Sequence, residues 1–200
     1  IDHGKCVVNN SISALTIVDM PFGSYEGDKI KAFDIAAEII SETNATAVKI
    51  EGGVEIAETI DFIVNRGIPV MGHIGLMPQK INLVGKFISV GKNEFENNKI
   101  ITDAKAISES GAFSVVLEAM KPSLAKKVTG LISIPTIGIG AGKYCDGQVL
   151  VIDDILGLYS NFTPKFVKKY CNLSDIINKS AKSFAKEVRT CKFPSKKYTY

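Results

Sequence analysis

Short apolar runs that end in an acidic residue constrain the fold of this chain most. Residues 15–19 (LTIVD), 47–51 (AVKIE) and 114–118 (SVVLE) all have this form. Runs this short and this rich in β-branched residues indicate buried parallel strands rather than helices. A carboxylate at the carboxyl end of such a strand faces the edge where α/β folds keep their active sites. The sequence therefore predicts a parallel sheet with Asp19, Glu51 and Glu118 at one edge.

Strand-like and helix-like segments alternate along the chain, which predicts a parallel sheet with right-handed crossovers. The expected strands are residues 15–19, 47–50, 69–74, 114–117, 136–139 and 148–152. The expected helices are residues 30–40 with Asp28 as the N-cap, 56–63, 103–110, 124–131 and 176–188. Residues 75–101 are polar and contain glycine, and a loop of this length in a compact domain is usually functional.

The number of expected strands leaves two architectures open. A complete (β/α)₈ barrel has eight strands and about 250 residues. Six strands in 200 residues therefore fit either an open doubly wound sheet or a barrel that lacks two βα units. We find no linker and no internal repeat, so the expectation is one domain over residues 1–200.

Composition and charge argue against several classes of partner. The 24 basic and 21 acidic residues are interspersed, and the net charge is +3. A nucleic-acid or membrane surface would need clustered basic residues, so we expect neither partner. The four cysteines show no metal-binding or disulfide spacing, and no apolar stretch has the length of a membrane span. We expect a cytoplasmic protein.

The first two strand ends carry residue types that suit a metal and an anionic substrate. Asp19 and Glu51 supply the hard oxygen ligands that Mg²⁺ prefers. Lys49 lies two residues before Glu51, so both side chains point to the same side of the strand. Together they predict a site that holds an anion beside a divalent cation. The alternative is an ordinary lysine–glutamate pair on the surface.

Two further residues are candidates for proton transfer. Glu118 follows an apolar run, and a carboxylate in apolar surroundings suits a general base. The alternative is an exposed acid that begins a loop. His73 ends its own strand and is equally well interpreted as a direct participant or as a supporting, hydrogen-bonded residue. The glycines of residues 138–142 (GIGAG) indicate that a strand end and loop pass closely against a ligand or a neighbour, rather than a phosphate site.

Taken together, these segments resemble the ketopantoate hydroxymethyltransferase family. The resemblance covers nearly all of the chain, and its most specific blocks are 48–53 (VKIEGG) and 72–79 (GHIGLMPQ). The other blocks are 18–22 (VDMPF), 117–118 (LE), 137–142 (IGIGAG) and 146–148 (DGQ). The resemblance implies a (β/α)₈ TIM barrel of the phosphoenolpyruvate/pyruvate type, assembled as a homodecamer.

The resemblance also implies a reaction and a role for each candidate. The family transfers a hydroxymethyl group from 5,10-methylenetetrahydrofolate to 3-methyl-2-oxobutanoate, giving 2-dehydropantoate for pantothenate synthesis. It implies that Asp19 binds Mg²⁺ and the oxo acid, Lys49 binds the oxo acid, and Glu51 completes the metal site. It further implies that Glu118 accepts the proton.

One departure from the family pattern leaves alternatives open. The block of the family that supplies a second metal-binding Asp and a substrate-binding Ser has no counterpart in the printed sequence. The expectation is a barrel without its first two βα units, in a chain that starts late. An inactive, truncated remnant of the enzyme is one alternative, and another Mg²⁺-dependent aldolase or lyase of 2-oxo acids is a second.

Overall fold

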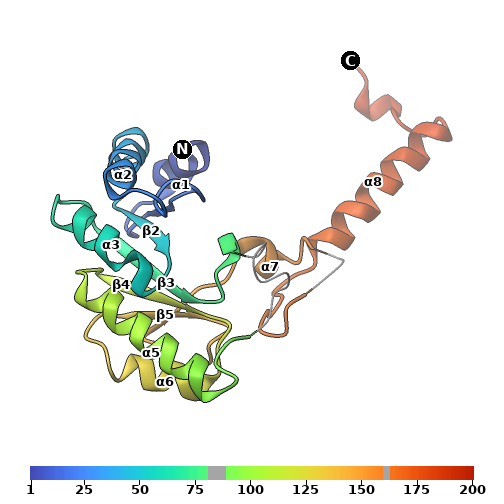
Figure 1. Cartoon of the computed structure of the whole chain (residues 1–200). Helices are drawn as coiled ribbons and strands as arrows, with labels where there is room; N and C mark the ends of the chain where they lie inside the picture. Colours follow the sequence, from blue (N-terminus) through green and yellow to red (C-terminus); the bar gives the residue numbers. More distant parts are fainter. Residues whose placement is uncertain (81–88, 160–162) are drawn as a thin grey trace. The chain divides into compact units, whose positions relative to one another are not determined.

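A computed structural model describes residues 1–80, 89–159 and 163–200 of the chain. The chain divides into two compact units, Ile1–Val149 and Leu150–Tyr200. The first unit contains the whole described sheet, and the second contains the C-terminal helices (Figure 1). The expectation of a single domain over residues 1–200 stays a prediction.

The first unit is built on a six-stranded, all-parallel sheet. Its strands are β1 (Ile17–Asp19), β2 (Ala47–Glu51), β3 (Val70–Gly75), β4 (Ser114–Glu118), β5 (Thr136–Ile139) and β6 (Gly147–Gln148). Their order in the sheet follows the chain from β1 to β6, without the reversal that defines a doubly wound sheet. The described strands therefore form a curled sheet like half of a barrel, and the doubly wound alternative is wrong.

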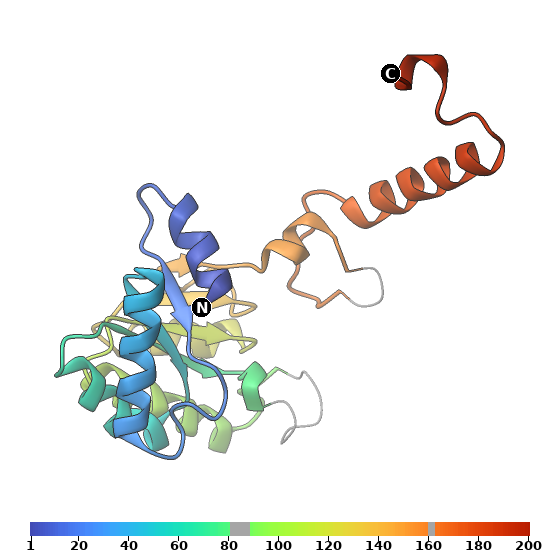
Figure 2. The same ribbon diagram turned by 90° about the horizontal axis from the view of Figure 1, so that it is seen from above.

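Helices cover the outer side of this sheet, as both ribbon views show (Figures 1 and 2). They are α1 (Asp2–Asn10), α2 (Lys29–Thr43), α3 (Ala57–Val64), α5 (Glu94–Glu109) and α6 (Pro122–Thr129). Two short 3₁₀ turns, η1 (Val54–Ile56) and η2 (Pro78–Lys80), follow the carboxyl ends of β2 and β3. Helix α2 begins as predicted, because the Asp28 carboxylate accepts a hydrogen bond of 2.8 Å from the Lys31 amide.

The core lies between the strands and these helices. Buried Ile39, Ile60 and Ile107 of the helices belong to one apolar cluster with Val48 and Val115 of the strands. Burying a side chain of this size contributes about 1.5–3 kcal/mol relative to leaving it in water. The core thus fixes the strand ends, on which the candidate site depends.

Helix α5 corrects the expected helix over residues 103–110, since it begins already at Glu94. The Asn93 side chain caps it by accepting from the Glu96 amide at 2.8 Å, and Glu94 and Glu96 suit the positive end of the helix dipole. Residues 94–101 are therefore helical and not part of a loop. Residues 81–88 of the expected loop lie outside the described residues.

The last predicted strand is also corrected, because β6 ends at Gln148 and helix α7 (Ile152–Leu156) follows. Asp153 and Asp154 occupy the first turn of that helix, where acidic residues stabilise the helix dipole. The predicted role of the glycine-rich segment is confirmed. A Cβ atom on Gly138 would lie 2.9 Å from the Cys145 sulfur and 3.0 Å from the Gln148 amide nitrogen.

A small polar network fixes the start of β5. The Asp146 carboxylate accepts hydrogen bonds from the Thr136 amide at 2.8 Å and from its hydroxyl at 3.0 Å. These hydrogen bonds, the backbone one first, lower the pKa of Asp146 below its usual value. The Asp146 side chain thereby ties the loop before β6 to the strand beside it.

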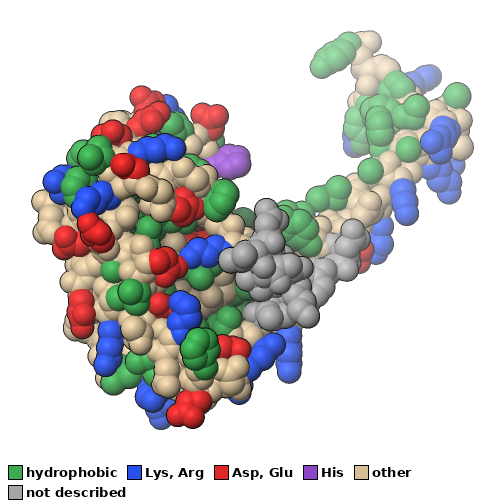
Figure 3. Space-filling model, viewed as in Figure 1, with side chains coloured by type: hydrophobic (Ala, Val, Ile, Leu, Met, Phe, Trp, Pro, Cys, Tyr) green, Lys and Arg blue, Asp and Glu red, His purple; other side chains and the backbone are tan. Residues whose placement is uncertain are grey.

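The second unit contains the predicted terminal helix, α8 (Leu173–Arg189), and a 3₁₀ turn η3 (Lys196–Tyr198). None of the residues of α8 is buried, and it carries both lysine and large apolar side chains (Figure 3). On the face of the first unit in the same view, acidic and basic side chains are interspersed, as the sequence indicates. No helix within residues 1–80, 89–159 and 163–200 has the length and apolar content needed to cross a membrane.

Candidate active site

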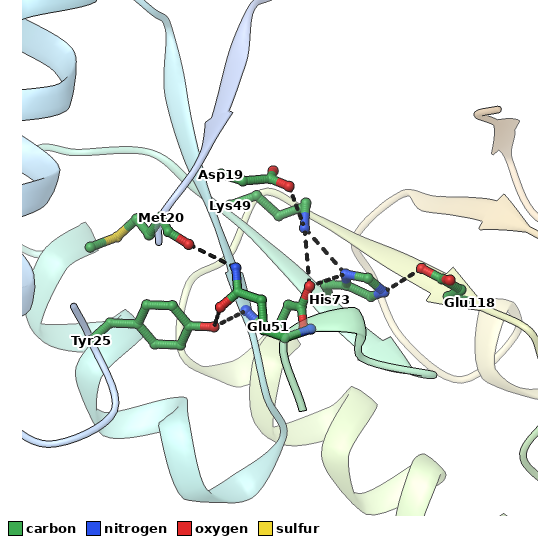
Figure 4. Close-up of polar contacts among 8 residues, drawn as sticks. Asp19, Met20, Tyr25, Lys49, Glu51, His73 and Glu118 are labelled. Carbon is green, nitrogen blue, oxygen red and sulfur yellow. Dashed lines mark hydrogen bonds and ion pairs between the residues drawn. The ribbon is translucent and has the colours of Figure 1, made fainter. Parts of the chain in front are cut away.

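The carboxyl ends of β1 to β4 bring the predicted site residues together (Figure 4). Asp19, Glu51 and Glu118 are the last residues of β1, β2 and β4, which confirms that the three acids share one edge. Strand register explains the meeting: Asp19 pairs with Lys49, and Glu51 pairs with His73. Because side chains alternate along a strand, residues two apart such as Lys49 and Glu51 face the same side.

A polar chain runs across these four strand ends. The Lys49 ammonium lies 3.2 Å from an Asp19 carboxylate oxygen and 3.2 Å from His73 Nδ1. On the far side of the imidazole ring, His73 Nε2 lies 3.2 Å from Glu118 Oε2. Glu51 borders the middle of the chain, with Oε1 at 3.9 Å from the Lys49 ammonium and 3.6 Å from His73 Nδ1. Lys49 and His73 thus connect Asp19 to Glu118.

The contact with Lys49 determines the tautomer of a neutral His73. An ammonium group has donors only, so His73 Nδ1 must accept and the ring proton must reside on Nε2. His73 Nε2 lies beside the Glu118 carboxylate without the alignment of a hydrogen bond, and it has no other partner among the described residues. The contact between His73 and the candidate base is therefore a close approach of two polar side chains and not a hydrogen bond.

The site residues differ in burial: four of them are mostly enclosed, and Asp19 lies at an open rim. The Glu51 and His73 side chains are each 4% exposed, whereas Asp19 is 60% exposed. The Lys49 side chain is 14% exposed and that of Glu118 is 12% exposed. A surface pair of Lys49 and Glu51 is therefore ruled out, and so is an exposed loop acid at position 118. Charges in such an enclosed wall interact more strongly than in water.

Asp19 and Glu51 offer oxygen ligands that suit a hard divalent cation, but they are only two. Asp19 and Glu51 both approach the Lys49 ammonium, so their oxygens face a common region that already attracts a cation. Mg²⁺ usually takes one or two protein carboxylates and completes its shell with substrate oxygens and water. Within the part of the chain that the structure describes, no group of three or more His, Cys, Asp and Glu is arranged to hold a metal. Asp19 and Glu51 are thus the two carboxylates that could bind the cation.

Two residues of the site were not predicted from the sequence, Tyr25 and Gln79. Tyr25 is 1% exposed, and its hydroxyl donates to Gln79 Oε1 at 2.7 Å and accepts from the Glu51 amide at 3.3 Å. Burial raises the pKa of Tyr25 well above its usual value, so the hydroxyl keeps its proton. A buried tyrosine usually needs a polar partner, but the burial of Tyr25 is visible only in the structure, so the sequence offers no signal beyond its closeness to Asp19.

A close backbone approach fixes the candidate base. The Leu76 amide donates to the Glu118 carbonyl at 3.0 Å, and Gly75 pairs with Glu118 across β3 and β4. A Cβ atom on Gly75 would lie 2.3 Å from that carbonyl oxygen, and its φ of +102° is one that side chains rarely adopt. Only glycine lets β3 pass this close to Glu118.

Comparison with known proteins places the chain in a family. The family model described as ketopantoate hydroxymethyltransferase matches residues 1–196. The chain belongs to the ketopantoate hydroxymethyltransferase family. Its relatives include the 3-methyl-2-oxobutanoate hydroxymethyltransferases of Brucella canis and Rhodospirillum rubrum, each 50% identical over all 200 residues. The chain spans 73% of the Brucella protein and 72% of the Rhodospirillum protein. The predicted family is confirmed.

A solved structure of a putative phosphonomutase from Burkholderia cenocepacia is similar over 94% of this chain and 88% of its own. It is 12% identical with a TM-score of 0.42, a likeness too slight to bear on function. The two most specific blocks of the family resemblance, residues 48–53 and 72–79, supply Lys49, Glu51, His73 and Gln79. In this member of the family, the resemblance and the strand-end cluster thus coincide.

Proposed function

We propose that the chain acts as a 3-methyl-2-oxobutanoate hydroxymethyltransferase in pantothenate biosynthesis. The observation that carries the proposal is the polar chain from Asp19 through Lys49 and His73 to Glu118. Lys49 supplies a cation for an anionic substrate, and Glu118 at the far end of the polar chain supplies a carboxylate base. Membership of the family supports the same reaction, because the relatives carry this name.

In the proposed reaction the substrate carboxylate binds at the Lys49 ammonium, which is mostly buried and lies between two acids. Asp19 and Glu51 would hold Mg²⁺ beside it through their carboxylate oxygens. When bound, Mg²⁺ would withdraw electron density from the keto group and favour the enolate of the substrate. The open position of Asp19 leaves room at the rim for the second substrate.

Glu118 is the proposed general base. Its carboxylate takes the proton from C3 of the oxo acid. Water adds to the methylene carbon of 5,10-methylenetetrahydrofolate and both C–N bonds of that carbon break, which releases tetrahydrofolate and leaves a one-carbon unit at the oxidation level of formaldehyde. C3 then bonds to this carbon, and its oxygen takes the proton from Glu118, which gives 2-dehydropantoate. His73 Nε2 lies 3.2 Å from Glu118 Oε2, so the imidazole ring would border the carboxylate on the side away from Lys49. A positioned base of this kind contributes about 10²–10⁴-fold to the rate.

The assembly and the cellular location also belong to the proposal. The family resemblance supports a homo-oligomer, decameric in the family, that works in the cytoplasm. Size-exclusion chromatography with light scattering measures the assembly directly. A chain that stays monomeric at micromolar concentration would contradict the oligomeric part of the proposal.

The test of the reaction is product formation. The purified chain is mixed with 3-methyl-2-oxobutanoate, Mg²⁺ and 5,10-methylenetetrahydrofolate, and 2-dehydropantoate is followed by mass spectrometry. We expect product only with the folate present, and we expect Lys49→Met to reduce it strongly while Lys105→Met, on the exposed side of α5, does not. Cleavage or condensation of the oxo acid without folate would favour the aldolase or lyase alternative. A folded chain that forms no product would contradict the proposal.

A further inference from the structure

A closed set of hydrogen bonds surrounds Gln79, beside the polar chain. The Gln79 backbone amide donates to Glu51 Oε2 at 3.1 Å, and its side-chain amide donates to the Met20 carbonyl at 2.8 Å. Its side-chain oxygen accepts from the Tyr25 hydroxyl at 2.7 Å, and that hydroxyl accepts in turn from the Glu51 amide at 3.3 Å. We call Tyr25 and Gln79 together the clamp.

The two oxygens of the Glu51 carboxylate have different partners, and one of them is held by the segment that contains Gln79. Oε2 accepts a hydrogen bond from the backbone amide of Gln79, whereas Oε1 faces Lys49 and His73. A carboxylate bound on one oxygen cannot rotate freely, so the direction of the other oxygen is set. The clamp also holds the carbonyl of Met20, the residue directly after Asp19. Two strand ends, β1 and β2, are thereby tied to the segment after β3 (Figure 4).

The Tyr25 end of the clamp and the Met20 carbonyl that it holds lie in the core, whereas Gln79 is partly buried. Tyr25 is 1% exposed and Met20 is 0% exposed. A buried polar group that loses its partner is costly, so each member depends on the others being in place. Tyr25 and Gln79 are 54 residues apart in the chain, and the clamp forms only when the strand ends are correctly aligned.

We propose that Tyr25 and Gln79 are positioning residues that set Glu51 and Asp19 for binding of the oxo acid. This inference rests on the proposed function and adds two residues to its site. Neither residue has to touch the substrate. Because the clamp acts on Glu51 and Asp19, which would hold Mg²⁺ beside the oxo acid, its loss affects substrate affinity, while Glu118 itself keeps its place.

Two variants each change one polar group of the clamp, and each has a matched control. Tyr25→Phe removes only the hydroxyl, and Tyr144→Phe makes the same change at a tyrosine outside the clamp. Gln79→Glu keeps the oxygen that Tyr25 needs but replaces the amide donor that faces the Met20 carbonyl. Gln148→Glu makes the same change at an amide that donates to the Gly142 carbonyl at 2.9 Å.

Kinetics at low temperature, expressed per folded molecule, separate positioning from stability. We expect Tyr25→Phe and Gln79→Glu to raise KM for the oxo acid about tenfold or more, because Glu51 and Asp19 then meet the oxo acid out of alignment. We expect kcat to fall as well, because Mg²⁺ held out of place would favour the enolate less. We expect both controls to keep the wild-type KM and kcat. A KM in the clamp variants equal to that of the controls overturns the inference, as does a loss that disappears once the unfolded fraction is subtracted.

Crystal structures of the same proteins test the clamp without any assay. We expect the Glu51 carboxylate to be rotated or split between positions in both clamp variants and unchanged in both controls. A Glu51 carboxylate that keeps its place in Tyr25→Phe and Gln79→Glu overturns the inference. If the wild-type chain forms no product, the proposed function fails, and the position of Glu51 still decides whether the clamp sets it.

Discussion

Replacing Gly75 by alanine tests how the fold places the candidate base. Gly75 combines a φ of +102° with a backbone contact to Glu118, and a Cβ atom there would lie 2.3 Å from the Glu118 carbonyl oxygen. Real Cβ contacts essentially never fall below 3.0 Å, so the two strands must separate by at least 3.0 − 2.3 = 0.7 Å. The Leu76 hydrogen bond to the same carbonyl is strained by the same movement.

The effect of Gly75→Ala has two parts with separate magnitudes. The positive φ alone costs an alanine about 1–2 kcal/mol. The steric overlap adds about 1–3 kcal/mol, as other overpacked sites do. Since the stability of a whole domain is about 5–15 kcal/mol, the variant should fold but melt earlier. A shift near 1 Å at the base predicts a loss of roughly 10²-fold in proton abstraction.

Gly67→Ala is the matched control, because Gly67 has a φ of +93° and no atom lies within 4 Å of the place that a Cβ atom would take. It carries the conformational cost without the overlap. The assay is exchange of the C3 hydrogen of 3-methyl-2-oxobutanoate with D₂O, followed by NMR well below the melting temperatures. We expect Gly67→Ala to exchange at the wild-type rate and Gly75→Ala to lose most of it. Equal exchange rates in the two variants would refute the idea that the close strand approach positions Glu118.

Two further predictions concern stability. The folded-state pKa of Asp146 is lowered, so its contribution is present above the unfolded value of 3.8 and is lost as pH falls through the folded pKa. Thermal melts of Asp146→Asn should therefore lie below wild type at pH 6 and approach it toward pH 2, and a constant gap over that range would contradict the assignment. Asn93→Ala removes the cap of α5 and should destabilise the chain by about 1 kcal/mol in urea unfolding. An unchanged unfolding midpoint would show that this cap does not stabilise α5.

The strands and the shared edge of the acids could be predicted because both depend on local patterns. Each strand is a short β-branched run, and strand polarity in a parallel sheet places Asp19, Glu51 and Glu118 on the same side. The start of α5 was harder to predict, because residues 94–99 are mostly polar and show no apolar stripe. Asn93, with Glu96 three residues later, is nevertheless a capping signal. Predicting the end of β6 would have required recognising Asp153 and Asp154 as the first turn of a helix.

The contacts of the site could not be predicted in the same way. The position of His73 between Lys49 and Glu118 depends on the register of three strands, and one residue of slip would turn its side chain away. The clamp depends on segments that are far apart in the chain, and nothing in the local pattern of Tyr25 or Gln79 marks them as partners. Residue types at strand ends are readable from sequence, whereas their distances are set by packing.

Exchange of the C3 hydrogen by wild-type protein and by Glu118→Gln is the most direct measurement of the proposed chemistry. It needs only the oxo acid, Mg²⁺ and D₂O, so proton abstraction is observed apart from folate binding and carbon–carbon bond formation. Glu109→Gln, at an exposed position of α5, controls for the substitution itself. We expect wild type and Glu109→Gln to exchange at the same rate and Glu118→Gln to be about 10²–10⁴-fold slower. Exchange by Glu118→Gln at the wild-type rate would show that another group removes the proton.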